Sequence, residues 1–112
     1  MILNNFRWKR FEIDLISFSN SELPKLHLIE VKTRTAGFLD HQDLLATITG
    51  TKTKQLRTAL RVLPAIISKL DQNEELVWQG AQVDLVGVGP FSLTSTGPRC
   101  AKINYIPQLF LL

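Results

Sequence analysis

The chain has 112 residues, of which 45% are hydrophobic and 21% charged, and its formal net charge is +3. This length supports one core and the composition is that of a globular protein, which excludes a disordered or fibrous protein and predicts a single domain over residues 1–112. The small positive charge permits an anionic partner such as nucleic acid without requiring one.

The cysteine content and the apolar segments bound the cellular setting. The single cysteine, Cys100, cannot form an intramolecular disulfide, and no paired Cys/His spacing indicates a zinc site. The apolar segment at the N-terminus is too short for a signal peptide, and no stretch reaches the ~20 apolar residues that span a bilayer. We therefore expect a soluble, cytoplasmic protein that does not bind membranes.

The N-terminal third has the pattern of β-strands. Residues 6–18 begin with loose alternation and end in an apolar run, which favours a bent or interrupted strand pair, or one long strand. A polar turn at 19–25 separates this segment from a second strand at 26–34. Two apolar runs joined by a short polar turn predict an antiparallel hairpin, which would bring Asp14 and Glu30 onto neighbouring strands.

A helix is predicted in the middle of the chain. Residues 35–51 have turn residues at both ends and an apolar middle, so we expect a mobile loop with a short helical turn. From Thr51 onward, apolar residues recur every three or four positions and predict an amphipathic helix of about five turns, with Thr51 or Thr49 as the N-cap. These apolar residues are Leu56, Ala59, Leu60, Leu63, Ile66, Ile67 and Leu70. Pro64 should kink or split that helix.

The C-terminal third returns to strands. A third strand is predicted around Val83 to Val88 and should end at the Gly-Pro pair 89–90. Residues 93–100 are predicted as a loop, and 101–110 as a short edge strand, because a central strand would not tolerate Pro107. The predicted order, strand, strand, helix, strand, strand, indicates an α/β (α+β) fold with a mixed central sheet flanked by helix.

The second predicted strand carries charged residues in an apolar run. Alternation places Leu28, Glu30 and Lys32 on one face, and Ile29, Val31 and Thr33 on the other, which we assign to the core. With Asp14 on the partner strand, two carboxylates and an amine would converge. Such a set can hold Mg²⁺ or Mn²⁺ and stabilise charge on a phosphoryl group. The same spacing also fits a solvated strand face, which is the commoner reason for Glu/Lys alternation.

Two motifs carry a resemblance to a known family. "FEIDLI" (11–16) and "LIEVKTR" (28–34), taken together, resemble the YraN-like (UPF0102) family of small uncharacterised bacterial proteins, in the PD-(D/E)XK nuclease-like superfamily. The likeness continues with "ITGTKTKQL" (48–56), "VDLVGV" (83–88) and "INYIPQLF" (103–110). It covers nearly the whole chain and implies a restriction-endonuclease-like core.

The resemblance also implies a site and an activity. It assigns Asp14 and Glu30 as metal ligands, with the backbone carbonyl of Val31 as a further ligand. It assigns Lys32 as the motif lysine, and the side chains of Asp14, Glu30 and Lys32 as catalytic. The implied activity is Mg²⁺-dependent hydrolysis of phosphodiester bonds in nucleic acid, with DNA as the expected substrate. Glu12 matches a glutamate usual in the family motif and either reaches the metal or faces solvent. The alternative is a catalytically inactive nucleic-acid-binding or scaffold protein of the same fold.

The basic residues are the candidate nucleic-acid contacts. Arg34, Lys52, Lys54 and Arg57 could each contact a phosphate, although a solvated helix face explains those on the helix equally well. Lys52 looks like the lysine that the family has at its helix start.

The start of the chain departs from the family pattern. Members of the family usually begin with an extra helix that bears a glutamate, whereas this chain starts at Met1 without it. We therefore expect an uncovered sheet face. Either the chain is a truncated or mis-started member of the family, or a second subunit of a homo-oligomer covers that face, or the activity has been lost.

The histidines and Asp84 have simpler explanations. His27 shares the predicted core face with Ile29, which favours a structural histidine, and His41 is expected to be a surface residue. An unpaired carboxylate in an apolar strand is costly, so Asp84 should have a partner. A structural pairing with a basic residue is favoured for Asp84 over metal binding.

Overall fold

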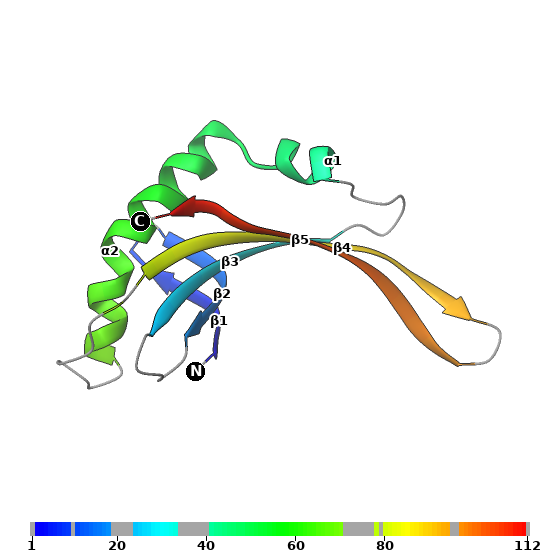
Figure 1. The fold of residues 1–112 in the computed structure, drawn as a ribbon, viewed down its shortest axis with the longest axis horizontal. Coiled ribbons are helices and arrows are strands. Elements are labelled where there is room, and N and C mark those ends of the chain that lie inside the picture. The colour runs from blue at the N-terminus through cyan, green and yellow to red at the C-terminus, as the bar shows by residue number, and fades with distance from the viewer. Residues whose placement is uncertain are drawn as a thin grey trace.

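The computed structural model describes residues 2–9, 11–18, 24–33, 41–70, 78, 80–94 and 97–111. These residues form, in chain order, β1 (Ile2–Trp8), β2 (Phe11–Phe18), β3 (Lys25–Thr33), α1 (His41–Ala46), α2 (Gly50–Leu70), β4 (Gly80–Thr94) and β5 (Gly97–Leu111). This order is that of an α+β fold and confirms the predicted mixed sheet with a helical layer (Figure 1).

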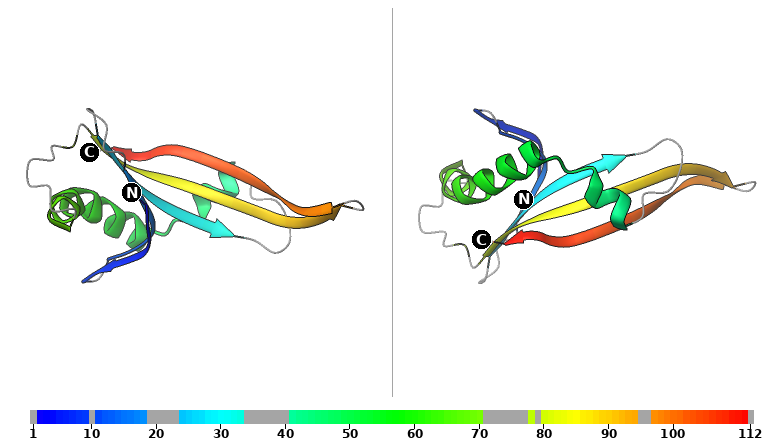
Figure 2. Two further views of the ribbon diagram at one scale, coloured as in Figure 1. Left: turned by 90° about the horizontal axis from the view of Figure 1, so that it is seen from below. Right: turned by 90° about the horizontal axis from the view of Figure 1, so that it is seen from above.

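The strands form one sheet in the order β1-β2-β3-β4-β5. Neighbouring strands are antiparallel except β3 and β4, which are parallel. A parallel pair needs a long crossover connection, and both helices lie within the crossover between β3 and β4. Figure 2 shows α2 lying along one face of the sheet. The main core fills the space between them and includes Ile13, Ile16, Leu28, Leu56, Leu60, Leu63 and Val83.

The N-terminal strands form two successive hairpins. Of the alternatives for residues 6–18, the strand pair is confirmed, although β1 begins earlier, at Ile2. Lys9, in the turn between β1 and β2, has a φ of 53°. The predicted antiparallel hairpin that joins the two acidic segments is confirmed as β2 and β3.

Helix α2 confirms the predicted amphipathic helix. Thr49 is its N-cap, because its Oγ1 accepts a hydrogen bond from the Lys52 N–H at 3.1 Å. Pro64 lies inside one continuous helix and does not split it. The carbonyl of Pro64 accepts a hydrogen bond from Trp78 Nε1 at 2.8 Å, so the chain after α2 is tied back to the helix.

The segment before α2 agrees with part of its prediction. The expected helical turn is α1, whose Leu44 packs with Leu85 and Ile106 in a second, smaller core. Residues 35–40, which belong to the predicted loop, lie outside the described residues.

The face assignment of β3 was wrong. Leu26, Leu28 and Glu30 are buried, whereas Ile29 and Val31, on the predicted core face, are half-buried. The alternation itself is as predicted, but α2 covers the face that carries Glu30. Glu/Lys alternation is typical of a solvent-exposed strand face. Here α2 covers that face and brings Lys52 to 3.5 Å from Glu30.

The C-terminal strands are longer than predicted. β4 continues through the Gly-Pro pair 89–90, and the predicted loop at 93–100 belongs largely to β4 and β5. The register shifts between Val88 and Phe91, so Pro90 lies at an irregularity where a missing N–H is tolerated. β5 is an edge strand as predicted, but it is a long one, and with β4 it extends beyond the rest of the sheet (Figure 1).

Candidate metal centre

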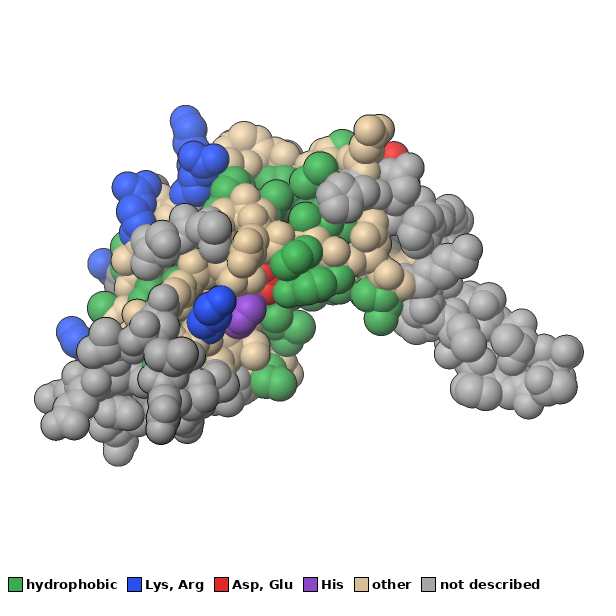
Figure 3. Space-filling model, viewed as in Figure 1, with side chains coloured by type: hydrophobic (Ala, Val, Ile, Leu, Met, Phe, Trp, Pro, Cys, Tyr) green, Lys and Arg blue, Asp and Glu red, His purple; other side chains and the backbone are tan. Residues whose placement is uncertain are grey.

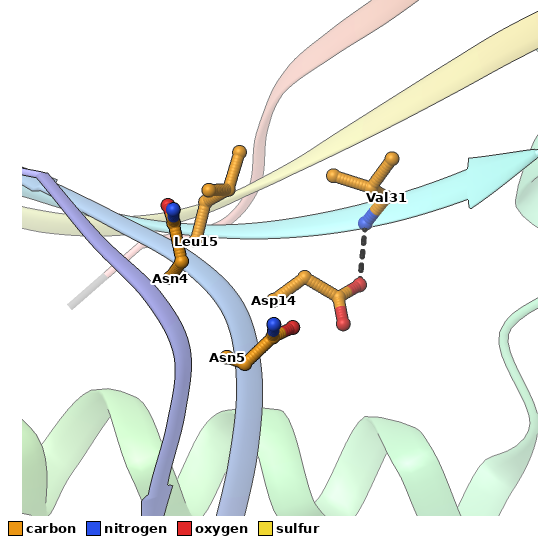
Figure 4. A pocket seen from close by; sticks show the side chains of 5 residues that line it. All are labelled: Asn4, Asn5, Asp14, Leu15 and Val31. Carbon is orange, nitrogen blue, oxygen red and sulfur yellow. Dashed lines mark hydrogen bonds between the residues drawn. The ribbon is translucent and has the colours of Figure 1, made fainter.

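Asp14 lies at an irregular point of β2. Ile13 and Ile16 both pack into the core although they are three positions apart, so the alternation of the strand breaks between them. The regular backbone pairing of β2 with β3 begins at Leu15 and does not include Asp14. Instead, Asp14 Oδ2 accepts a hydrogen bond from the Val31 N–H at 2.8 Å (Figure 4). This contact fixes the Asp14 carboxylate against β3.

Glu30 is the buried acid of the site. It is 5% exposed, and its Oε1 and Oε2 lie 3.9 Å from Lys32 Nζ and 3.5 Å from Lys52 Nζ, respectively. Oε2 has no hydrogen-bond partner in the described part of the chain. Burial raises the pKa of Glu30 and the charge of Asp14 raises it further, against the lowering effect of Lys52 and Lys32. Even with two lysines, the surroundings of Glu30 therefore disfavour its charged form.

The structure brings three of the predicted residues together. Asp14 is close enough to Glu30 to raise its pKa, and Lys32 contacts Glu30. Val31 contacts Asp14 through its N–H, and the ligand role of its carbonyl stays a prediction. Glu12 is exposed and forms an ion pair with Arg7 at 3.2 Å, so it faces solvent.

An open hollow of about 420 Å³ adjoins Asp14. It is lined by Asn4, Asn5, Asp14, Leu15 and Val31, from three neighbouring strands (Figure 4). Sequence reasoning missed the contribution of β1. The available signal was the Asn4-Asn5 doublet in a strand, since asparagine tolerates a positive φ better than most residues, and Asn5 has a φ of 47°.

The predicted nucleic-acid contacts do not behave alike. Lys52 is held at the site, since its Nζ contacts Glu30 and donates to the Glu12 carbonyl at 3.3 Å. Lys54 and Arg57 are exposed on α2, and the Arg57 guanidinium lies 4.7 Å from the centre of the Phe110 ring. Figure 3 shows Lys and Arg side chains gathered over α2. Arg34 lies outside the described residues.

Asp84 forms a second acidic cluster, on β4. It is fully buried, and four groups donate to it: His27 Nδ1 at 2.7 Å, Gln82 Nε2 at 2.7 Å, Tyr105 OH at 2.8 Å and the Gln108 N–H at 3.0 Å. An ionised carboxylate only accepts, so Nδ1 of His27 carries the proton. Asp84 is thus paired as predicted, and His27 has a partner although its face is the less buried one.

The donors around Asp84 outweigh its burial. Burial alone would raise the pKa of Asp84, but the hydrogen bond from Gln108, followed by those from Gln82, His27 and Tyr105, lowers it below its ordinary 3.8. The sequence did not reveal Gln82, Tyr105 or Gln108 as partners. Gln108 reaches Asp84 from an irregularity of β5, where it has a φ of 57°.

The residues around Glu30 fit a divalent cation. A buried carboxylate oxygen lacks a hydrogen-bond partner within the described ranges, and a second carboxylate repels it. Carboxylate oxygens are the ligands that Mg²⁺ and Mn²⁺ prefer. Among the described residues, no three His, Cys, Asp or Glu side chains lie close enough together to hold one metal ion. Asp14 and Glu30 would therefore share the ion with water, substrate or neutral donors.

Comparison with known proteins gives a family. The model of the uncharacterised protein family UPF0102 matches residues 1–88, which is most of the chain. The chain belongs to this family. No curated protein and no solved structure matches it. The predicted UPF0102 resemblance is therefore confirmed.

The UPF0102 match includes the carboxylates of both acidic clusters. Residues 1–88 contain Asp14, Glu30 and Lys32 as well as Asp84. Tyr105 and Gln108, which donate to Asp84, follow the matched segment. In the parts of this UPF0102 chain that the structure describes, neither helix combines the length and apolar character needed to cross a bilayer.

Proposed function

We propose that this UPF0102 protein is a Mg²⁺-dependent nuclease of the PD-(D/E)XK type, which hydrolyses phosphodiester bonds in nucleic acid, with DNA as the substrate. The observation that supports it is the Glu30 carboxylate, buried beside Asp14 with one oxygen that has no hydrogen-bond partner among the described residues. The Lys52 ammonium, 3.5 Å away, balances the charge of this oxygen only in part, and a buried carboxylate oxygen without a hydrogen bond is costly. Mg²⁺ or Mn²⁺ held by Asp14, Glu30 and the Val31 carbonyl would satisfy it.

The roles of the side chains follow from their contacts. When bound, the metal would polarise a phosphoryl oxygen and lower the pKa of a water molecule. Asp14 keeps lone pairs for a ligand while Oδ2 accepts from Val31, because a carboxylate has about four acceptor positions. Lys32, whose Nζ lies 3.9 Å from Glu30 Oε1, would stabilise the negative charge that develops on phosphorus-bound oxygens.

The exposed basic residues of α2 would hold the nucleic-acid backbone. Lys54, Arg57 and Arg61 are exposed on the helix whose first turn supplies Lys52 to the site. Contacts of this kind position a nucleic acid without reading its sequence. The resulting affinity should fall steeply as salt is raised.

Metal-dependent cleavage tests the proposal. Purified protein is incubated with single-stranded, duplex and branched DNA in Mg²⁺, Mn²⁺ or EDTA. We expect cleavage with either metal, loss of at least about 100-fold in Asp14→Ala and Lys32→Ala, and full activity in Glu12→Ala. Glu12 is the matched control because it lies on the same strand as Asp14 but faces solvent. No cleavage by the wild type, or equal cleavage by the Asp14 and Lys32 variants, would overturn the nuclease.

One observation favours a second candidate, a nucleic-acid-binding protein without catalysis. The Lys52 ammonium lies 3.5 Å from Glu30 Oε2 and partly balances the charge of the site without a metal. This candidate predicts that DNA binding, measured by fluorescence anisotropy, is the same in Mg²⁺ and in EDTA at matched ionic strength. It also predicts weaker binding by Lys54→Ala/Arg57→Ala with no cleavage under any condition.

A further inference from the structure

Asn5 has an unusual backbone conformation for a strand residue. Its φ is 47°, in the left-handed region that costs a non-glycine residue roughly 1 kcal/mol. The pairs on either side of it, Asn4 with Leu15 and Phe6 with Ile13, place Asn5 opposite Asp14. The irregular points of β1 and β2 therefore coincide at this pair. Strained backbone conformations cluster at active sites and ligand-binding positions, which makes the side chain of Asn5 a candidate for a functional role.

The side chain of Asn5 shares a space with the carboxylate of Asp14. Both residues line the open hollow, together with Val31. Asp14 gives Oδ2 to the Val31 N–H. Figure 4 shows the amide of Asn5 directed toward the carboxylate of Asp14, whereas Asn4 lies beside Leu15.

The site also needs oxygen donors besides its acids. Among the residues that the structure describes, no third His, Cys, Asp or Glu joins Asp14 and Glu30. Mg²⁺ takes about six oxygen ligands, and amide carbonyls serve as well as carboxylates and water. A neutral amide adds a ligand without adding to the repulsion that already raises the pKa of Glu30.

We propose that the side-chain oxygen of Asn5 is a further ligand of the divalent cation, contributed by β1 across the hollow from Asp14. This inference rests on the proposed metal site and adds a residue to it. Asn5 lines the hollow, and asparagine combines tolerance of its positive φ with a hard oxygen donor.

Calorimetric titration of the full chain with Mn²⁺ tests the assignment without relying on activity. We expect Asn5→Ala and Asn5→Gly to weaken Mn²⁺ binding about ten-fold, which is the scale of losing one supporting ligand. Asn5→Asp should bind at least as tightly as the wild type, because it replaces an amide oxygen with a charged one. Asn4→Ala is the matched control and should bind like the wild type.

Glycine at position 5 separates a ligand from a structural residue. Glycine adopts a positive φ freely, so Asn5→Gly should unfold in urea at the same concentration as the wild type or higher while its Mn²⁺ affinity falls. Wild-type affinity in Asn5→Gly, or an equal loss in Asn4→Ala, overturns the role of Asn5 and leaves the metal site intact. No Mn²⁺ binding by the wild type overturns the metal site itself, and the role of Asn5 with it.

Discussion

Glu30 and Asp84 are buried carboxylates on neighbouring parallel strands, and their surroundings are opposite. Asp84 accepts four hydrogen bonds, and its pKa is lowered. Glu30 has two lysines at 3.5 and 3.9 Å and an oxygen with no hydrogen-bond partner among the described residues, and its pKa is raised. Burial is common to both, so the difference comes from the donors around Asp84 and from the charge of Asp14 beside Glu30.

The contrast separates an acid that supports the fold from one that is free for a ligand. Each acceptor position of Asp84 that a donor fills contributes to stability and removes a place for a metal. Glu30 has two lysine ammoniums at 3.5 and 3.9 Å, and its Oε2 accepts no hydrogen bond within the described residues, which leaves a place for a cation. Perturbed carboxylates of the second kind are the better functional candidates.

Removal of the Asp84 carboxylate is expected to have the largest effect. Asp84→Ala would leave the buried amide of Gln82 and the part-buried donors of Tyr105 and Gln108 without their acceptor, so the free energy of unfolding should fall by about 3 kcal/mol. Urea unfolding followed by tryptophan fluorescence measures this loss. Glu12→Ala, which removes an exposed acid, should change stability by less than about 0.5 kcal/mol. Equal stability of the two variants would show that the Asp84 network is unimportant.

The ionisation of Tyr105 reports on the same network. Burial of its hydroxyl, followed by the hydrogen bond to Asp84 and the charge of Asp84, raises the pKa of Tyr105 to about 12. The chain has one tyrosine, so an ultraviolet titration of the folded protein reads this group alone. We expect a midpoint near 12 in the wild type and a lower one in Asp84→Asn. A wild-type midpoint at the ordinary value of 10.0 would contradict the contact.

Neutralisation of Glu30 is expected to change the free energy of unfolding only slightly. Unlike the loss of the Asp84 carboxylate, it should stabilise the protein. Because the pKa of Glu30 is raised, the folded state holds its proton more tightly than the unfolded state does. The stabilisation that this provides is complete below the ordinary value of 4.5 and is lost as the pH rises through the folded pKa. Glu30→Gln should therefore match the wild type in acid and exceed it at neutral pH, by about 1 kcal/mol or less.

The test is urea unfolding of both proteins, without metal, from pH 4.5 to neutrality. Addition of Mg²⁺ at neutral pH should then stabilise the wild type and leave Glu30→Gln unchanged. A Glu30→Gln variant that becomes less stable than the wild type as the pH rises would show that the pKa of Glu30 is lowered, as that of Asp84 is.

Local patterns predicted much of this fold. The two apolar runs joined by a short polar turn predicted the β2-β3 hairpin, and the helical spacing from Thr51 onward predicted α2. Both depend on residues close together in the sequence, where strand and helix periodicities act directly. The convergence of Asp14, Glu30 and Lys32 followed from the hairpin and the family resemblance.

What the sequence did not predict depends on distant partners. Which face of β3 is buried is decided by α2, whose Lys52 makes a buried Glu30 tolerable. β4 passes through Pro90 because its pairing with β5 is irregular there. The partners of Asp84 on β5 and the position of Asn5 opposite Asp14 likewise depend on strand register, which periodicity does not determine.

The parallel pairing of β3 with β4 predicts that the two acidic clusters form at different stages of folding. The Asp14–Val31 hydrogen bond closes a loop of 17 residues within a hairpin. The His27–Asp84 contact spans 57 residues, a separation that includes both helices. Because long loops cost more entropy to close and slow the search for native contacts, we expect Asp14 and β3 to associate early and the Asp84 network to form late. The candidate metal centre would then be assembled before the contacts that complete the sheet around it.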